Sequence, residues 1–137
     1  MSKMGCKCGS VISNTLCPCP TEGWIVRDQD QDDYFESSSR DIATYFAAAQ
    51  AGRRNEWLSE FFAPKVGADW CDADVIFAIM AHHKRRLFLS VAECEKCGRL
   101  HVQRGPSINS YFTYSPDEPE YAAVLRSQSA KTNGQVP

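Results

Sequence analysis

The stretches CKCG (residues 6–9) and CEKCG (residues 94–98) are two versions of one short pattern, written near opposite ends of the chain. Each contains two cysteines, and a glycine follows the second one. Glycine reaches the left-handed backbone region at little cost, so the chain can turn sharply there and aim backbone N–H groups at the sulfurs. Two such turns, brought together from distant segments, would present four sulfurs to one point.

Four thiolates at one point are the ligand set of a closed, tetrahedral structural zinc site. The predicted ligands are Cys6, Cys8, Cys94 and Cys97. C-x-x-C-G is a strong half-site and C-x-C-G a weaker one, and each runs into a short apolar segment, as in a zinc ribbon. We therefore predict a structural Zn²⁺ that couples metal binding to folding. The alternative is a set of unconnected buried thiols, since free cysteine is often buried.

A second cysteine pair, Cys17 and Cys19 in the segment CPCP, competes for the first half of this site. Its second cysteine precedes a proline, which has no N–H to donate and cannot take a positive φ. We therefore favour Cys6 and Cys8 as ligands. Exposed thiols at CPCP would instead suit a redox or metal-handling role, which stays open as an alternative. Cys71, beside Trp70, is predicted to be a core thiol.

Composition argues against several classes of protein. The 137-residue chain has a net charge of −2, so it has no global basic field for binding phosphates. No stretch approaches the roughly 20 apolar residues of a membrane span, and the first residues do not resemble a signal peptide. We therefore expect no membrane and a cytoplasmic location, where thiols stay reduced and paired cysteines indicate metal ligands.

The pattern of apolar residues predicts an α+β fold: a small antiparallel sheet with zinc-ribbon-like knuckles, and two or three helices inserted between them. Predicted strands cover residues 11–12, 23–27, 87–94, 99–104 and 109–114. Predicted helices start near 41 and cover 54–62, 72–83 and 118–126. The apolar stripes of the first and third helices are Ile42, Tyr45, Phe46 and Ala49, and Val75, Ile76, Ile79 and Met80. We expect a single zinc-stabilised domain over 1–126 and a disordered tail over 127–137.

An acidic run with two aromatic residues precedes the first predicted helix. Its members are Asp28, Asp30, Asp32, Asp33, Tyr34, Phe35 and Glu36. Concentrated negative charge steers a basic partner, and an exposed aromatic side chain anchors it, so these residues are the predicted partner-binding surface. The run could equally be the Asp-rich start of a helix or a solvated loop.

No catalytic constellation is recognisable. The sequence has no phosphate-binding loop, dinucleotide turn or nucleophile elbow, and four thiolates leave a metal no open position for substrate. We expect His82 and His83 to form a polar helix end. His101, in the strand after the second knuckle, is a fifth candidate ligand, but we expect it to lie on a strand surface. The basic residues Lys84–Arg86, Arg99 and Arg104 leave nucleic-acid binding as an alternative function, which the acidic balance of the chain disfavours.

The whole pattern resembles small bacterial cysteine-pair proteins that are encoded beside polymorphic or contact-dependent toxins and are taken to be immunity proteins. The matching elements are Cys6-Lys7-Cys8-Gly9, then Asp28-Gln29-Asp30 with Tyr34-Phe35, and the C-x-x-C-G-R-L stretch from Cys94 to Leu100. The CPCP segment departs from that pattern. The resemblance implies a non-enzymatic protein that binds a cognate protein toxin, and an acidic surface implies that the toxin is basic.

Overall fold

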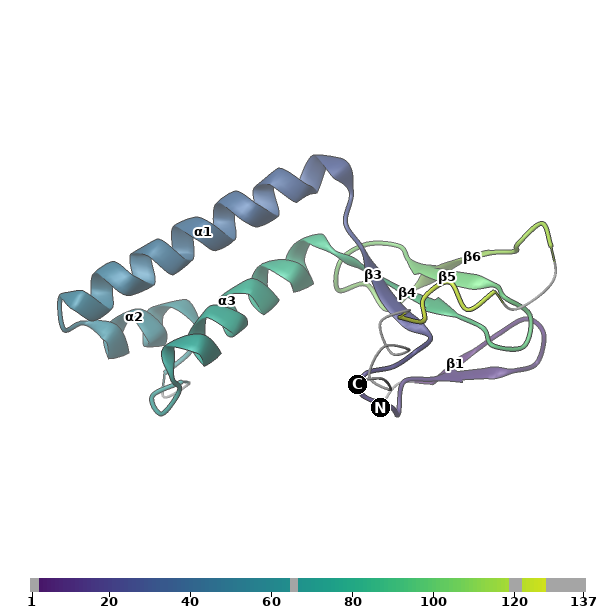
Figure 1. Ribbon diagram of the computed structural model, residues 1–137, viewed down its shortest axis with the longest axis horizontal. Helices are drawn as coiled ribbons and strands as arrows, with labels where there is room; N and C mark the ends of the chain where they lie inside the picture. Colours follow the sequence, from purple (N-terminus) through teal and green to yellow (C-terminus); the bar gives the residue numbers. More distant parts are fainter. Residues whose placement is uncertain (1–2, 65–66, 119–121, 128–137) are drawn as a thin grey trace, which may run out of the picture. The chain divides into compact units, whose positions relative to one another are not determined.

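Strands occupy the two ends of the chain, and helices occupy its middle (Figure 1). The structure, a computed structural model, describes residues 3–64, 67–118 and 122–127. In chain order the elements are β1 (Lys3–Gly5), β2 (Val11–Ser13), β3 (Glu22–Ile25), α1 (Asp28–Gln50), α2 (Arg54–Phe61), α3 (Asp72–Leu87), β4 (Leu89–Glu93), β5 (Leu100–Gln103) and β6 (Tyr111–Tyr114). The predicted α+β class, with helices inserted between the two knuckles, is confirmed.

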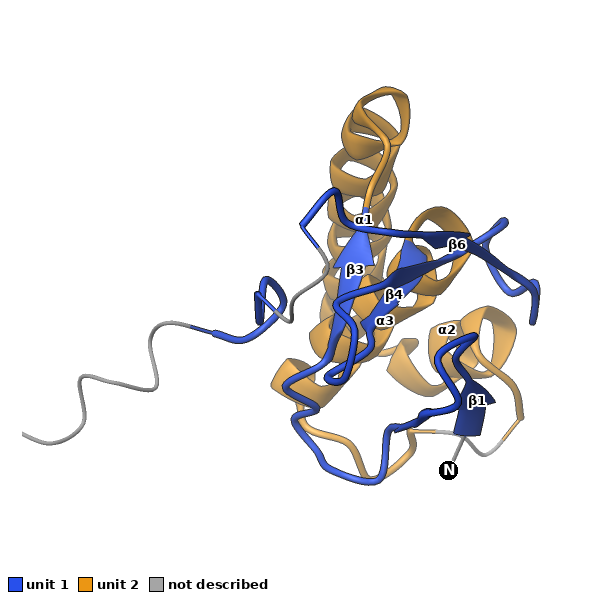
Figure 2. Cartoon of the chain, turned by 90° about the vertical axis from the view of Figure 1, so that its right-hand side faces the viewer, with its two compact units in different colours: residues 1–25, 89–137 blue, residues 26–88 orange. Residues whose placement is uncertain are grey.

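The chain divides into two compact units (Figure 2). The sheet unit combines both ends of the sequence, residues 1–25 and 89–137, and the helical unit is the continuous segment 26–88. The sheet unit is therefore assembled across an insertion, whereas the helical unit is built from neighbouring segments. That the whole of 1–126 is one zinc-stabilised domain stays a prediction.

The sheet unit contains two antiparallel sheets. β1 pairs with β2, and a second sheet has the strand order β3-β4-β5-β6. Five of these strands lie where the apolar pattern predicted them. β1 was not predicted, because its three residues, KMG, carry no alternation of apolar and polar side chains.

Helix α1 begins at Asp28, well before the predicted start near residue 41. The acidic run is thus the Asp-rich start of a helix, one of the alternatives that the sequence left open. Asp28 and Asp30 lie in the first turn, where negative charge is favourable beside the positive end of the helix dipole. The inward positions of this segment are filled by Ser37 and Ser38, both 5% exposed, so the usual apolar stripe is missing there.

The helical unit has an aromatic core. Its fully buried members are Tyr45, Leu58, Val75 and Ile79, one or two from each helix. The rings of Trp57 and Phe61 stack beside them at a centroid distance of 4.7 Å. Four of the eight residues predicted on apolar stripes lie outside this core: Phe46 is 38% and Met80 is 41% exposed, and Ala49 and Ile76 are half-buried.

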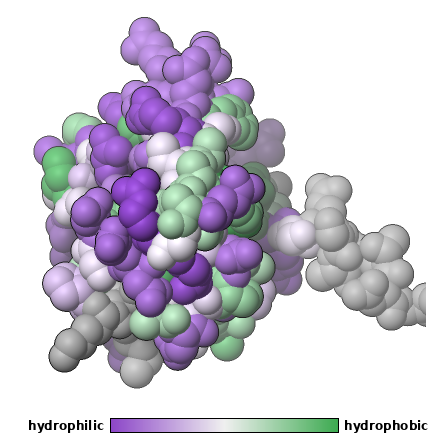
Figure 3. Space-filling view, turned by 90° about the vertical axis from the view of Figure 1, so that its left-hand side faces the viewer, coloured by the Kyte–Doolittle hydropathy of each residue, from purple (hydrophilic) through white to green (hydrophobic). Residues whose placement is uncertain are grey.

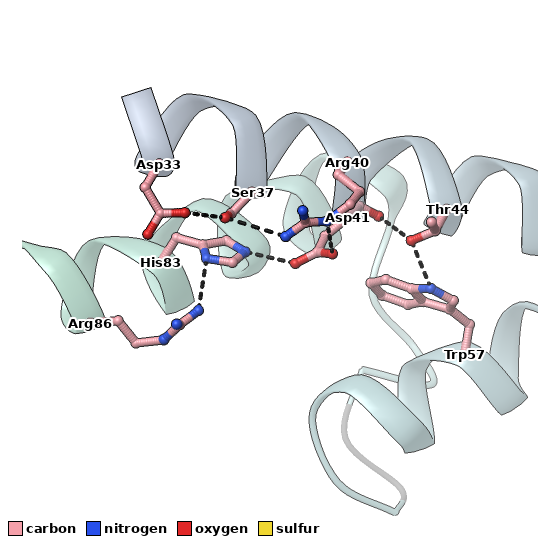
Figure 4. A network of polar contacts seen from close by, with 8 residues as sticks. All are labelled: Asp33, Ser37, Arg40, Asp41, Thr44, Trp57, His83 and Arg86. Carbon is pink, nitrogen blue, oxygen red and sulfur yellow. Dashed lines mark hydrogen bonds and ion pairs between the residues drawn. The ribbon is translucent and has the colours of Figure 1, made fainter. Parts of the chain in front are cut away.

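A polar network joins α1 to α3 (Figure 4). His83 is 2% exposed, so the prediction that it forms a polar helix end is wrong. Helix α3 continues to Leu87 and places His83 one turn after Ile79, on the buried face. Arg86 Nη1 lies 3.4 Å from His83 Nδ1, and an arginine can only donate, so Nδ1 accepts. Nε2–H therefore donates to Asp41 Oδ2 at 2.7 Å.

The end of the chain differs from the prediction. Residues 122–126 of the predicted last helix are not helical, and residues 119–121 lie outside the described residues. Of the predicted tail, residues 128–137 also lie outside them. Among the helices of the described ranges, none combines the length and the hydrophobicity needed to cross a membrane.

Replacing Asp41 with alanine tests the polar network. The substitution leaves the buried Nε2–H of His83 without its acceptor, and we expect it to lower the free energy of unfolding by about 1–3 kcal/mol. Urea denaturation followed by circular dichroism measures this. Asp32→Ala, at an exposed position of the same helix, is the matched control and should change stability by less than about 0.5 kcal/mol. Equal effects of the two substitutions would show that the network does not stabilise the unit.

Candidate metal centre

Two hairpin tips carry the four cysteines of the repeated pattern. Cys6 and Cys8 lie in the turn between β1 and β2, and Cys94 and Cys97 lie in the turn between β4 and β5. The sequence folds this way locally because each hairpin needs a tight turn, and each turn has a glycine with positive φ. The φ angle is +87° at Gly9 and +68° at Gly98.

The two turns have the same hydrogen-bond pattern. In the first, the N–H of Cys6 donates to Ser10 O at 2.8 Å, and the N–H of Gly9 donates to Cys6 O at 2.9 Å. In the second, Cys94 N–H donates to Arg99 O at 2.9 Å, and Gly98 N–H donates to Cys94 O at 2.8 Å. The extra residue of C-x-x-C lengthens the second turn by one position. Both turns are therefore knuckles of the type that the glycines predicted.

The structure brings all four sulfurs together. Cys6 Sγ lies 3.6 Å from Cys97 Sγ, Cys8 Sγ lies 3.7 Å from Cys94 Sγ, and all four atoms lie within 4.8 Å of one another. These contacts are far longer than the roughly 2.05 Å of a disulfide bond. Four sulfurs at about 2.3 Å from a central ion would be about 3.8 Å apart along each tetrahedral edge. The cluster could therefore hold a metal ion.

The surroundings of the cluster lower the pKa of one cysteine, Cys97, and raise the pKa of another, Cys94. The backbone N–H of Arg99 lowers the pKa of Cys97 to about 6, and the other three cysteines add to this effect. Burial raises the pKa of Cys94 to about 11. Arg99 also places its Nη1 3.5 Å from Cys97 Sγ, where its positive charge stabilises negative charge on sulfur. A bound cation would provide the remaining stabilisation that the buried thiolates need.

The other three cysteines lie elsewhere. Cys17 is exposed, and Cys19 Sγ contacts Thr21 Oγ1 at 3.4 Å, so the CPCP pair takes no part in the cluster. Cys71 is also exposed, so the prediction of a core thiol is wrong. It occupies the N-cap of α3, and its N–H donates to Asp74 Oδ2 at 3.0 Å in a capping box.

The predicted partner-binding residues lie on the first turns of α1 and divide between two sides of the helix. The exposed members are Asp28, Asp32, Asp33, Phe35 and Glu36. Tyr34 turns inward and packs on Phe88 at a ring distance of 5.0 Å, while Asp30 pairs with Arg27. The outward side of α1 therefore combines carboxylates with one phenylalanine, and we call Asp28, Asp32, Phe35 and Glu36 the acidic face.

The basic residues of the nucleic-acid alternative belong to different units. Lys84, Arg85 and Arg86 form the last turn of α3 in the helical unit, where they complement the helix dipole. In the sheet unit, Arg99 contacts Cys97 and donates to Ser115 Oγ at 3.1 Å. Arg104 lies over the ring of Phe112 at 4.2 Å. Each of these residues has a structural role within its own unit.

His101 is a second buried histidine, after His83, that sequence reasoning did not place in the interior. It is 3% exposed, so its predicted surface position is wrong. Its register partners are Ala92 on β4 and Thr113 on β6, and paired residues point to the same face of a sheet. Ala92 packs with Cys6 and Cys94, so this is the cysteine side of the sheet. His101 Nδ1 contacts Thr113 Oγ1 at 3.2 Å, and Nε2 has no partner among the described residues.

Replacing Cys94 or Cys97 with serine tests the cluster as a metal centre. We expect the bound metal to be lost, because serine is a poor ligand for a soft site. A bound ion would tie Cys8 to Cys94, which are 86 residues apart in the sequence. Losing it removes the binding free energy that favours the folded state, so the melting temperature should fall by on the order of 10 °C. Elemental analysis and thermal melting measure the two effects.

The matched control for this experiment is Cys17→Ser, which removes an exposed thiol outside the cluster. This variant should keep both the metal content and the melting temperature of the parent chain. Wild-type melting of the Cys94 and Cys97 variants would overturn the assignment, and so would metal loss in the Cys17 variant.

His101 makes stability depend on pH. Burial, together with the charge of Arg99, lowers the pKa of His101 below its ordinary value. As pH falls through about 6.5, the unfolded chain takes up a proton that the folded chain resists, so stability falls. This loss ends once the pH is below the lowered pKa of the folded state. Urea unfolding at a series of pH values should show a shallower dependence for His101→Asn, and identical slopes in this range would contradict the prediction.

Comparison with known proteins identifies the family of the chain. Residues 2–118 match the model of a family described as "Domain of unknown function (DUF8617)". No curated protein and no solved structure matches the chain significantly. Because the family model spans most of the sequence, from before the first knuckle to beyond β6, the chain belongs to the DUF8617 family.

Proposed function

We propose that this chain is a non-enzymatic binding protein, an immunity protein that neutralises a cognate basic toxin through the acidic face of α1. The observation that carries the proposal is the composition of that face. Asp28, Asp32 and Glu36 follow one another at intervals of four residues and are exposed, and Phe35 beside them is 57% exposed. This is a compact surface of carboxylates around one large aromatic side chain.

Phe35 packs against a neighbouring ring on one side. Its ring contacts that of Tyr34 at 5.5 Å, and Tyr34 in turn packs against Phe88 at 5.0 Å. An aromatic side chain that is already ordered loses little conformational entropy on binding, which suits it as the anchor of an interface. Tyr34 therefore links Phe35 of the acidic face to Phe88 through ring contacts.

The carboxylates act at longer range. Residues four positions apart on a helix lie about 6 Å apart along its axis, well within a Debye length of roughly 8 Å at physiological salt. Their fields add, so they attract a positively charged partner and orient its approach. An enzyme that binds a polyanion such as nucleic acid needs a basic active site, and an acidic face of this kind complements it.

The metal in this proposal is zinc with a structural role. Four cysteine thiolates select a soft ion with tetrahedral geometry, which zinc and iron both satisfy. The fit of the 3.6 Å and 3.7 Å sulfur contacts to a tetrahedral edge supports such an ion. All four positions are taken by protein sulfur, so the ion stabilises the hairpins and leaves no site for a substrate.

The test uses the gene next to the one that encodes this chain. Its product is expressed alone and together with this protein, and cell growth is measured. We expect the parent chain to restore growth, and the double variant Asp32→Lys/Glu36→Lys to lose this protection. Direct binding of the purified pair should weaken by at least tenfold in the variant and in high salt, since the attraction is electrostatic.

The matched control is Asp117→Lys/Glu118→Lys, which makes the same charge change at two exposed acidic residues of the sheet unit. This control should protect as the parent chain does. Equal loss in both variants would mean that net charge alone matters. Full protection by Asp32→Lys/Glu36→Lys would reject the acidic face. Salt-sensitive binding of a DNA or RNA duplex by the parent chain would favour the nucleic-acid alternative instead.

A further inference from the structure

The outward side of α3 forms a shallow apolar groove that the proposed function does not use. The groove has a volume of about 560 Å³, and its aromatic walls are Phe62, Trp70 and Phe77. Phe77 is 74% exposed, more than any other large hydrophobic side chain of the described residues. Figure 3 shows one end of the molecule, on which patches of hydrophobic surface lie between hydrophilic ones. An apolar groove with charged residues at its rim is typical of a surface that binds another molecule.

The floor of the groove has a symmetric arrangement along α3. Ala78 and Ala81 lie at its centre, and Asp74 and Arg85 lie at its two ends. In the sequence, the midpoint between Asp74 and Arg85 is also the midpoint between Ala78 and Ala81. On a helix with 3.6 residues per turn, these four residues fall on one side, opposite the buried residues Val75, Ile79, His83 and Leu87.

We propose that this face binds the same face of a second copy of the chain, with the two α3 helices antiparallel about a two-fold axis. In an antiparallel pair centred on this midpoint, a residue that precedes the midpoint lies opposite the partner's residue that follows it by the same number of positions. Asp74 is then opposite the partner's Arg85, and Arg85 is opposite the partner's Asp74. The interface is self-complementary in charge, which a two-fold contact requires.

Packing supports the same arrangement. Ala78 lies opposite the partner's Ala81, and these small side chains let two helices approach to the lower end of the usual 8–10 Å range. Phe77 then lies beside the partner's Ala81, where close approach of the helices covers its ring. An acidic partner or a basic partner would match only one of the two charged ends, whereas a second copy matches both. The acidic face lies on α1 and takes no part in this contact.

Two charge variants and their mixture test the proposal. In a homodimer of the Arg85→Glu variant, Asp74 of each copy lies opposite a negative charge at position 85 of the other copy. In a homodimer of the Asp74→Lys variant, Arg85 of each copy lies opposite a positive charge at position 74 of the other copy. We expect the parent chain to form a dimer of its 15.3 kDa subunits, and each variant alone to dimerise at least tenfold more weakly. An equal mixture should form the heterodimer, because both contacts are then between opposite charges. Light scattering after gel filtration and native mass spectrometry distinguish these species.

The design separates folding defects from interface defects. Asp74→Lys also removes the carboxylate that accepts from Cys71 N–H, so this variant alone can lose stability. Recovery of association in the mixture cannot be explained by such a loss. Arg53→Glu, an exposed charge reversal outside the groove, should dimerise like the parent chain. A monomeric parent chain across a dilution series, or a mixture that stays monomeric, would overturn the proposal.

Discussion

The constraint that shapes the sheet unit is that its two halves lie at opposite ends of the chain, where they meet at four sulfurs and through the pairing of β3 with β4. Cys6 contacts Cys97 and Cys8 contacts Cys94, and the sequence separations are 91 and 86 residues. The sheet unit is thus assembled from two ends of the chain, with an entire helical unit inserted between β3 and β4. Bringing the two ends of the chain together costs loop-closure entropy. The apolar core of the sheet unit, which must offset this cost, is small. The buried residues of that core are Cys6, Ile12, Ala92 and Cys94, so two of its four members are themselves candidate ligands.

The helical unit depends on other forces. Its core is built by aromatic and aliphatic packing around Tyr45, and the hydroxyl of Tyr45 donates to Asp72 and accepts from Arg54. Burial and the hydrogen bond to Asp72 raise the pKa of Tyr45, with burial the larger cause. This unit needs no metal to explain its packing. The two units therefore differ in what holds them together: a cysteine cluster lies in the sheet unit, and an aromatic core with buried hydrogen bonds lies in the helical unit.

Sequence reasoning succeeded where a local rule applies. The cysteine–glycine pattern predicted both turns, because a positive φ after the second cysteine is a local requirement. Alternating or helical apolar patterns likewise located α2, the start of α3, and the strands β4, β5 and β6. Sequence reasoning failed where tertiary contacts, rather than the apolar pattern, decide the local structure. The first turns of α1 bury serines, and their polar sequence therefore did not indicate a helix facing a core.

The sequence by itself determined the two knuckles and the class of the fold, since turns, strands and helices follow from residues close together in the chain. The sequence favoured one set of four cysteines by a local rule, but only the tertiary structure brings their sulfurs together. Cys6, Cys8, Cys94 and Cys97 come together while Cys17 and Cys19 do not, because the pairing of hairpins is a long-range event. The burial of His83 and His101 was decided in the same way. A histidine is polar in any sequence pattern, and it becomes a core residue only when a distant carboxylate or hydroxyl, here Asp41 or Thr113, supplies its hydrogen bond.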